Sequence, residues 1–309
     1  MARLLQFVVL PDVLLIRLTQ KEDTMPSHAI HAPVSYRAMS EEDVPAAHEL
    51  SQALRWPHRA EDWQFVLRLG IGFVAEEAGV VIGTGLCWKQ GQQASLGMII
   101  VSPAHQGKRI GSELMRLVLE ALGNRCTLLN ATPAGQPLYE RLGFVATGTI
   151  NQHQGTMNAV DPVALAGGET LRPFEPGDIE TIIELGNRAT GMSRCEVLKA
   201  LLSTAETVVL ERNGEAVGFS VMRRFGRGYA IGPVVASDSE RAKALIACWS
   251  GAYTGSFVRV DVTGTSGLQD WLAQVGLVQV DTVVAMARNG VPPADSALKQ
   301  FAIINQALC

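Results

Sequence analysis

Hydrophobic and polar positions alternate in two different periods along the chain from about Val34 onward. A period of two, rich in β-branched residues, predicts strands over 34–38, 72–77, 80–89, 94–101 and 127–131. A period near 3.6 predicts helices over 40–54, 63–69, 112–122 and 136–142, and one more strand begins at 144. The alternation of strands and helices predicts an α/β fold.

The same order of elements returns in the second half of the chain. The segment LRPFEPGDIETIIELGNRA corresponds to YRAMSEEDVPAAHELSQAL, and VRVDVTGTSGLQDWLAQVGLV corresponds to TLLNATPAGQPLYERLGFV. A repeat of about 130 residues is too long for a solenoid and predicts two copies of one domain. We expect an N-terminal extension over 1–33, domains over 34–150 and 169–309, and a linker over 151–168. Each domain should be α/β, with a mixed, mostly antiparallel twisted sheet flanked by helices.

Composition and charge exclude several classes of function. The formal net charge is −4 with no long run of one sign, and a nucleic-acid partner would need a basic face. No apolar run reaches the roughly 20 residues that span a bilayer. The five cysteines are scattered without CxxC spacing, which argues against a disulfide framework and against a zinc site. We therefore expect a cytoplasmic protein with no metal, no nucleic-acid partner and no membrane partner.

The first residues faintly resemble a secretion signal, because Arg3 precedes a short apolar stretch. Pro11 and Asp12 interrupt that stretch, and no small-residue cleavage site follows. We interpret this segment as an additional terminal extension.

The segment MIIVSPAHQGKRIGSELM, from Met98 to Met115, has the pattern of an anion-binding site. It predicts a buried strand, a short loop and then a helix, whose first N–H groups are unpaired and carry partial positive charge. Gly107 and Gly111 allow an anion close to the backbone, and Lys108 with Arg109 add positive charge. These residues predict a phosphate or pyrophosphate site, although similar turns also occur in proteins that bind no phosphate.

The stretch QGKRIG, from Gln106 to Gly111, resembles the [Gln/Arg]-x-x-Gly-x-[Gly/Ala] cofactor loop of the GNAT superfamily of acyl-CoA-dependent N-acetyltransferases. The stretch TPAGQPLYERLGFV is similar to the second signature of that family. Two departures stand out: Thr132 replaces a frequent asparagine, and Arg109 replaces the central glycine. We therefore expect the backbone at Arg109 to adopt a conformation open to any residue. The resemblance covers 34–149, and the whole arrangement resembles bacterial tandem GNAT proteins.

The resemblance implies acetyl-CoA as the acyl-donor cosubstrate and 34–150 as the catalytic domain. The pantetheine arm would follow one strand, and the pyrophosphate would lie on the loop after it. The implied cofactor-binding residues are Ile99, Ile100, Val101, Gln106, Gly107, Lys108, Arg109, Ile110, Gly111, Ser112 and Thr132.

The implied chemistry is direct attack of an amine on the thioester. The leaving thiolate, with a thiol pKa of about 8.5, needs a proton or a hydrogen bond, and a phenol with a pKa near 10 can supply it. Tyr139 is our candidate general acid. Glu76 and Glu77 are candidate bases, because strand alternation points one of them toward the reaction centre, although exposed hairpin carboxylates are the other interpretation.

Residues between the first two helices are candidates for binding the acceptor. Trp56 could shape a pocket, while His58, Arg59 and Asp62 could hold a polar substrate. The alternative is that the tryptophan packs beneath a loop. Asp261, at the end of the VRVDV strand, could anchor a substrate cation or could cap a local turn.

The second domain lacks the residues of the proposed chemistry. In the aligned repeats, Glu240 replaces Gln106, Arg241 replaces Gly107, Leu245 replaces Gly111 and Leu272 replaces Tyr139. This pattern predicts a degenerate domain that does not bind acetyl-CoA. We expect a monomer or homodimer that acetylates a small-molecule or peptide amine; the alternative is a non-catalytic acyl-CoA-binding or regulatory module.

Overall fold

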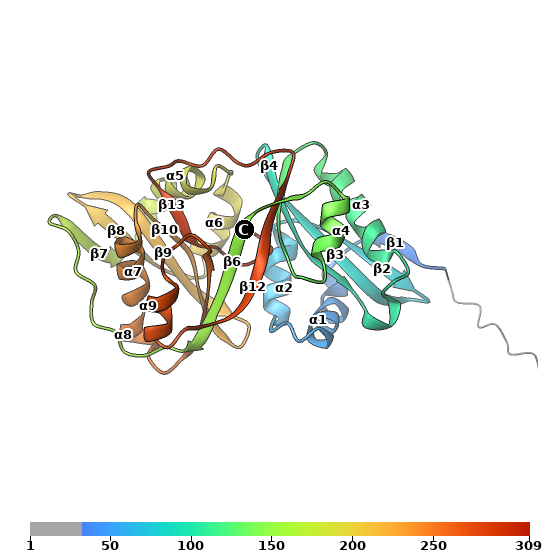
Figure 1. The fold of residues 1–309 in the computed structure, drawn as a ribbon, viewed down its shortest axis with the longest axis horizontal. Helices are drawn as coiled ribbons and strands as arrows, with labels where there is room; N and C mark the ends of the chain where they lie inside the picture. Colours follow the sequence, from blue (N-terminus) through green and yellow to red (C-terminus); the bar gives the residue numbers. More distant parts are fainter. Residues whose placement is uncertain (1–32) are drawn as a thin grey trace, which may run out of the picture. The chain divides into compact units, whose positions relative to one another are not determined.

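The elements of the first half follow the order that the hydrophobic pattern predicts. The computed structural model describes residues 33–309, so almost all of the predicted N-terminal extension over 1–33 lies outside the described residues. The first half (Figure 1) consists of β1 Ser35–Ala38, α1 Val44–Ala53, α2 Ala60–Arg68, β2 Ile71–Glu77, β3 Val80–Gln90, β4 Gln93–Val101, α3 Ile110–Leu122, β5 Cys126–Ala131, α4 Gln136–Arg141 and β6 Val145–Thr156.

The second half repeats this order, which confirms the repeat. From β7 onward it consists of β7 Glu169–Pro173, α5 Ile179–Thr190, α6 Cys195–Leu202, β8 Glu206–Arg212, β9 Glu215–Phe225, β10 Gly228–Ala236, α7 Ser239–Ala247, α8 Ser250–Tyr253, β11 Phe257–Thr263, α9 Gln269–Gln274, β12 Val278–Arg288 and β13 Lys299–Ala302. Among the described elements, α8 and β13 have no counterparts in the first half. No helix within 33–309 is long and apolar enough to cross a bilayer.

An ion cluster recurs at the same place in both halves. An arginine on the first strand binds an aspartate at the start of the following helix and a glutamate on the second strand. The two clusters are Arg37 with Asp43 and Glu76, and Arg172 with Asp178 and Glu211. Because each cluster ties a strand to the next helix and to the neighbouring strand, it stabilises the same corner of the fold twice.

The two halves share one sheet because they exchange strands. The order is β1-β2-β3-β4-β5-β12-β6-β11-β13-β10-β9-β8-β7, so β12 of the second half lies between β5 and β6 of the first (Figure 1). All pairings are antiparallel except β4–β5 and β10–β11. The predicted linker over 151–168 begins inside this sheet, because β6 continues to Thr156 and pairs with both β11 and β12.

In each half, the two strands of the parallel pair separate partway along their length, and the gap between them is filled in only one of the halves. The pairing of β4 with β5 ends at Ser95, and that of β10 with β11 ends at Ile231. In the second half, β13 enters the resulting gap and pairs with both neighbours, where Ala302 faces Val234 and Val262. In the first half, the corresponding gap opens into a cavity.

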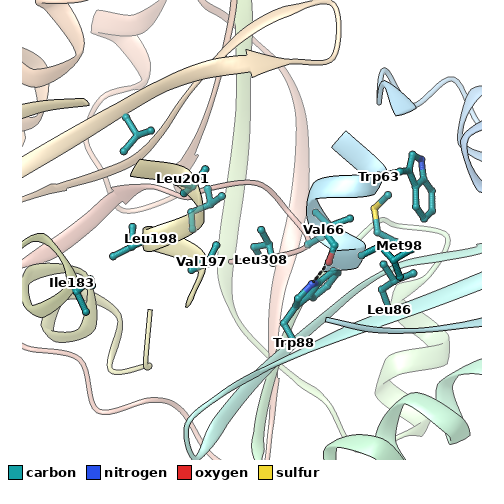
Figure 2. Packing of buried hydrophobic residues seen from close by; sticks show 14 of the residues in the cluster. Trp63, Val66, Leu86, Trp88, Met98, Ile183, Val197, Leu198, Leu201 and Leu308 are labelled. Carbon is teal, nitrogen blue, oxygen red and sulfur yellow. Dashed lines mark hydrogen bonds between the residues drawn. The ribbon is translucent and has the colours of Figure 1, made fainter. Parts of the chain in front are cut away.

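One hydrophobic core crosses the boundary between the halves. Helix α2 and strands β3 and β4 of the first half face helices α5 and α6 and the C-terminal segment of the second (Figure 2). The indole of Trp88 donates a hydrogen bond of 2.7 Å to the Val66 carbonyl at this boundary. The buried members that Figure 2 labels are Trp63, Val66, Leu86, Trp88, Met98, Ile183, Val197, Leu198, Leu201 and Leu308.

Candidate functional site

A cavity of about 810 Å³ lies where β4 and β5 diverge. Its walls come from β4, the loop before α3, α4, the connection between α1 and α2, and several segments of the second half. It therefore unites most of the predicted site in one volume. The predicted site residues that line it are Trp56, His58, Asp62, Ile99, Ile100, Val101, Gln106, Gly107, Arg109, Ile110, Gly111, Ser112, Thr132 and Tyr139.

A β-bulge at Met98 exposes the edge of β4 to this cavity. Met98 has a φ of +55°, and the register against β3 shifts here, since Gly97 pairs with Leu86 but Ile100 pairs with Thr84. The Thr84 hydroxyl donates a 2.8 Å hydrogen bond to the Met98 carbonyl and supports the bulge. Because β5 has already diverged, backbone groups of the strand after the bulge face the cavity.

The loop between β4 and α3 is built differently from our expectation. Arg109 has φ +62° and ψ +11°, in the left-handed region. Our expectation of a conformation open to any residue is therefore wrong, because an L-residue pays about 1–2 kcal/mol there. Gly107 also has a positive φ, of +79°, and a Cβ on it would meet no atom within 4 Å. Lys108 belongs to the loop but does not line the cavity.

The two helices that follow the fourth strand of each half present different N-termini. No side chain caps α3, so its first N–H groups remain available at the cavity. In α7, the Asp238 carboxylate accepts a 3.0 Å hydrogen bond from the Arg241 amide. The second helix thus already carries an acidic group where an anion would bind.

Tyr139 lies in α4 beside Gly135 and lines the cavity. Its side chain packs against Phe144, and the residue is 8 % exposed. Burial raises the pKa of the Tyr139 phenol to about 12, so it is protonated at neutral pH. A neutral phenol at this place can donate a hydrogen bond into the cavity.

Neither predicted base reaches the cavity, which corrects the sequence interpretation. Glu76 accepts a 3.0 Å hydrogen bond from Arg37 within the ion cluster that both halves share. Glu77 lies 3.0 Å from His105 Nε2. Of these two carboxylates and His105, only the histidine lines the cavity. Both glutamates therefore bind neighbouring side chains outside the cavity.

His58 lies in the connection between α1 and α2, surrounded by aromatic rings. Its ring centroid is 5.8 Å from that of Trp56, 6.3 Å from that of Trp63 and 5.7 Å from that of Phe225. Its Nδ1 is buried without a hydrogen-bond partner among the described residues. Burial, reinforced by the charge of Arg259, lowers the pKa of His58 to about 4, so the imidazole is neutral at pH 7.

Arg59 and Asp62 join the two halves of the chain. Asp62 accepts hydrogen bonds of 2.9 Å from the Arg59 amide, 2.8 Å from Arg59 Nη2 and 2.9 Å from the Gly226 amide. Burial acts to raise the pKa of Asp62, but these donors outweigh it and hold the pKa below the usual value. Asp62 lines the cavity and Arg59 does not. Their mutual pairing corrects the idea that both are free to bind substrate.

The Asp261 carboxylate is also paired with an arginine side chain. It is 4 % exposed and forms a bidentate pair with Arg259, with Nε and Nη2 of Arg259 at 2.9 Å and 2.7 Å from the carboxylate. Asp261 itself does not line the cavity, whereas Arg259 does. The structure therefore presents an arginine at this wall, where the sequence suggested a carboxylate for a substrate cation.

Sequence reasoning missed the contribution of the second half to the cavity. Residues from β9, the turn between β9 and β10, β11, β12 and the C-terminal segment complete its wall. They are Phe225, Arg227, Arg259, Asp281, Asn305, Gln306 and Ala307. The spacing of Arg259 and Asp261, two apart on one strand, was the available signal, because it places both side chains on the same face.

Comparison with known proteins matches both halves to one family. Models described as "Acetyltransferase (GNAT) domain" match residues 68–146 and residues 182–302. The chain is also 23 % identical over 277 residues to the uncharacterized N-acetyltransferase YitH of Bacillus subtilis. The aligned region covers 87 % of this chain and 96 % of that protein.

Solved structures share the fold of the whole described chain. A proposed acetyltransferase of Pyrococcus horikoshii has a TM-score of 0.73 and 20 % identity, covering 89 % of this chain and 96 % of that one. A GCN5-related N-acetyltransferase of Sphaerobacter thermophilus has a TM-score of 0.63 and 19 % identity, with coverage of 85 % and 98 %. A tandem GNAT protein from the clavulanic acid biosynthesis pathway has a TM-score of 0.62 and 14 % identity, with coverage of 85 % and 100 %.

Proposed function

Since this chain belongs to the GNAT superfamily of N-acetyltransferases and carries two such domains in tandem, we propose that it transfers an acetyl group from acetyl-CoA to the amine of a small molecule or peptide. The observation that carries this proposal is one continuous cavity. It connects the uncapped start of α3, the open edge of β4 and the Tyr139 side chain. The start of the helix, the exposed strand edge and the candidate proton donor therefore line the same cavity.

The cavity suits acetyl-CoA by its shape and its donors. Gly111 lines the cavity at the start of α3, and because it lacks a Cβ its backbone is open to a ligand there. The first N–H groups of α3 and the Arg109 guanidinium would hold the pyrophosphate. Backbone groups of Ile99 and Val101 would hold the pantetheine arm. When bound, acetyl-CoA supplies a thioester carbonyl, and a β4 amide can stabilise charge that develops on its oxygen.

Tyr139 is the proposed general acid. With a pKa of about 12 it remains a neutral donor throughout the physiological pH range. It is a weaker acid than the departing thiol, whose pKa is about 8.5. We therefore propose that Tyr139 stabilises the leaving thiolate through a hydrogen bond and relays a proton to it. The net proton comes from the attacking amine, which loses it as the amide forms.

An amine that binds as its ammonium ion must lose a further proton before it attacks, and the proposed acceptor for this first proton is Asp281 of β12, acting through water. Two carboxylates line the cavity, Asp62 and Asp281. The oxygens of Asp62 already accept hydrogen bonds from Arg59 and from the Gly226 amide. Asp281 is exposed and accepts one from the Thr282 amide. It also pairs in register with Gln152, which lines the cavity.

We propose that only the first half binds acetyl-CoA, with 34–150 as the catalytic domain and 169–309 as a degenerate copy. In the second half, β13 occupies the gap between β10 and β11, and Asp238 caps α7. Both features would exclude a pantetheine arm and a pyrophosphate. A cytoplasmic site of action and the absence of a resident metal belong to the same proposal.

The second candidate function is a non-catalytic acyl-CoA-binding or regulatory module. One observation favours it: Glu76 and Glu77 are both engaged outside the cavity, so no strand carboxylate is free beside the open edge of β4. Binding without turnover would identify such a module.

The test is a thiol-release assay with acetyl-CoA and a panel of amines. Tyr139→Phe should lower kcat about 100-fold while the Kd for acetyl-CoA changes little, because the phenol acts on the leaving group. Tyr253→Phe is the matched control, since Tyr253 donates a 2.6 Å hydrogen bond to Glu206 in the second half. It should retain kcat. Acetyl-CoA binding without release of thiol for any amine would reject the enzyme in favour of the binding module.

A further inference from the structure

Positive charge accumulates beside the cavity, where the second half meets the connection between α1 and α2. Three guanidinium groups surround two carboxylates there, in the Arg59–Asp62 and Arg259–Asp261 pairs together with Arg223. Arg223 has no carboxylate partner among the described residues. Its Nη2 donates to the Ile304 carbonyl at 2.9 Å, and its Nε is buried without an acceptor.

The uncompensated charge lies directly behind the cavity lining. The ring of Phe225, which lines the cavity, has the Arg223 guanidinium 4.6 Å and the Arg259 guanidinium 5.6 Å from its centroid. Burial lowers the pKa of Arg223 to about 10, so this group stays charged at neutral pH. A buried cation without a partner is costly, and a negative charge nearby would offset that cost.

Arg259 offers a free donor at the same wall. Its Nε and Nη2 are used by Asp261, whereas its Nη1 contacts no hydrogen-bond acceptor within 33–309 and is not among the buried polar atoms without a partner. The Arg259 side chain is 11 % exposed and lines the cavity, so its accessible part faces that volume. Arg227, whose guanidinium lies 4.9 Å from the Phe257 ring, also lines this cavity.

We propose that the acceptor is an amine that also carries a carboxylate, and that Arg259 Nη1 and Arg227 bind this carboxylate while the amine lies at the open edge of β4. The proposal rests on the proposed function and assigns the second half a role in choosing the acceptor. A charge-assisted hydrogen bond from a guanidinium to a carboxylate is stronger than a neutral one. The positive wall would repel amines that carry additional positive charge, such as polyamines and aminoglycosides.

The test compares matched acceptors in the thiol-release assay. Each α-amino acid is compared with its carboxamide and each ω-amino acid with the alkylamine of equal length, with spermidine as a polycation. For the wild type, kcat/KM should be about 10- to 100-fold higher for the carboxylate of the preferred pair. Two variants should reduce this ratio toward one. The first is Arg227→Gln. The second combines Arg259→Gln with Asp261→Asn, so that no buried carboxylate is left unpaired.

Arg224→Gln is the control, because Arg224 is exposed, stacks on Tyr229 and does not line the cavity. It should keep the wild-type ratio. Equal use of carboxylates and their neutral partners by the wild type, or a ratio that survives both variants, would overturn the proposal while leaving the acetyltransferase intact. Absence of turnover with every amine, despite acetyl-CoA binding, would overturn the proposed function and this inference with it.

Discussion

Gly97 of β4 packs directly against Ala307 of the C-terminal segment, so that a Cβ on Gly97 would lie 2.9 Å from the Ala307 Cα. The contact brings the end of the second half to the strand that borders the first half's cavity. Ala307 lines the cavity, and the adjacent Leu308 belongs to the shared core. The end of the second half is therefore part of the site.

Gly97→Ala should push the C-terminal segment away from β4. Because the new methyl group meets backbone, we expect a loss of about 1–3 kcal/mol in the free energy of unfolding, measured in urea. The KM for the acceptor should rise more than the Kd for acetyl-CoA. Gly148→Ala on β6 is the control, since its Cβ would meet nothing within 4 Å. Equal effects of the two substitutions would contradict the contact.

Arg109→Gly should increase stability, because it relieves a left-handed residue at the start of α3. The relief of about 1–2 kcal/mol is partly offset by the larger unfolded-state entropy of glycine. We expect a gain of about 0.5–1 kcal/mol in urea denaturation and weaker acetyl-CoA binding. Lys108→Gly removes the same charge from a residue that has no positive φ, so it should not be stabilising. A stabilising Lys108→Gly would argue against the backbone explanation.

Glu76→Gln and Glu211→Gln should have similar effects, because both glutamates occupy the same position in the repeated ion cluster. Each should cost less than about 1 kcal/mol in the free energy of unfolding, as expected for partly exposed ion pairs. Glu76→Gln should keep kcat within about twofold. A fall of about 100-fold in kcat for Glu76→Gln alone would restore this residue as the base.

His58 should make stability depend on pH between about 4 and 6.5. Its pKa is depressed in the folded state, so the unfolded state binds the extra proton first as pH falls, and stability falls with it. Between pH 7 and pH 5 the wild type should lose about 2 kcal/mol more than His58→Gln, measured by urea denaturation at both values. Parallel losses in the two proteins would contradict a buried neutral imidazole.

Local pattern was enough to predict most of the elements, including the strand and the helix on either side of the loop over 102–109. The predicted strand over 94–101 and helix over 112–122 correspond to β4 and α3. These elements were predictable because hydrophobic periodicity and the positions of glycines depend only on residues that are close together in the sequence. The left-handed backbone of Arg109 was not predictable in this way. The side chain there usually excludes that conformation, and the surrounding structure imposes it.

The parts of the site that depend on distant residues escaped prediction. Arg37 lies 39 positions before Glu76, and His105 lies 28 positions after Glu77, so the pairs that occupy these carboxylates leave no local pattern. Strand exchange is similar: an alternating pattern predicts that Val278–Arg288 forms a strand but does not say which strands it pairs with. This exchange places β12, with Asp281, at the cavity.

The most direct test of the central claim is calorimetric titration of acetyl-CoA into the full chain and its Gly111→Trp variant. A Cβ at Gly111 would already contact Val101 and Leu138, so an indole there would occupy the cavity that Gly111 lines. Gly251→Trp is the control, because its Cβ meets no atom within 4 Å and it lies in α8 of the second half. We predict about one binding site per chain, lost in Gly111→Trp and kept in Gly251→Trp. Two sites per chain, or unchanged binding by Gly111→Trp, would contradict a single working cofactor site in the first half.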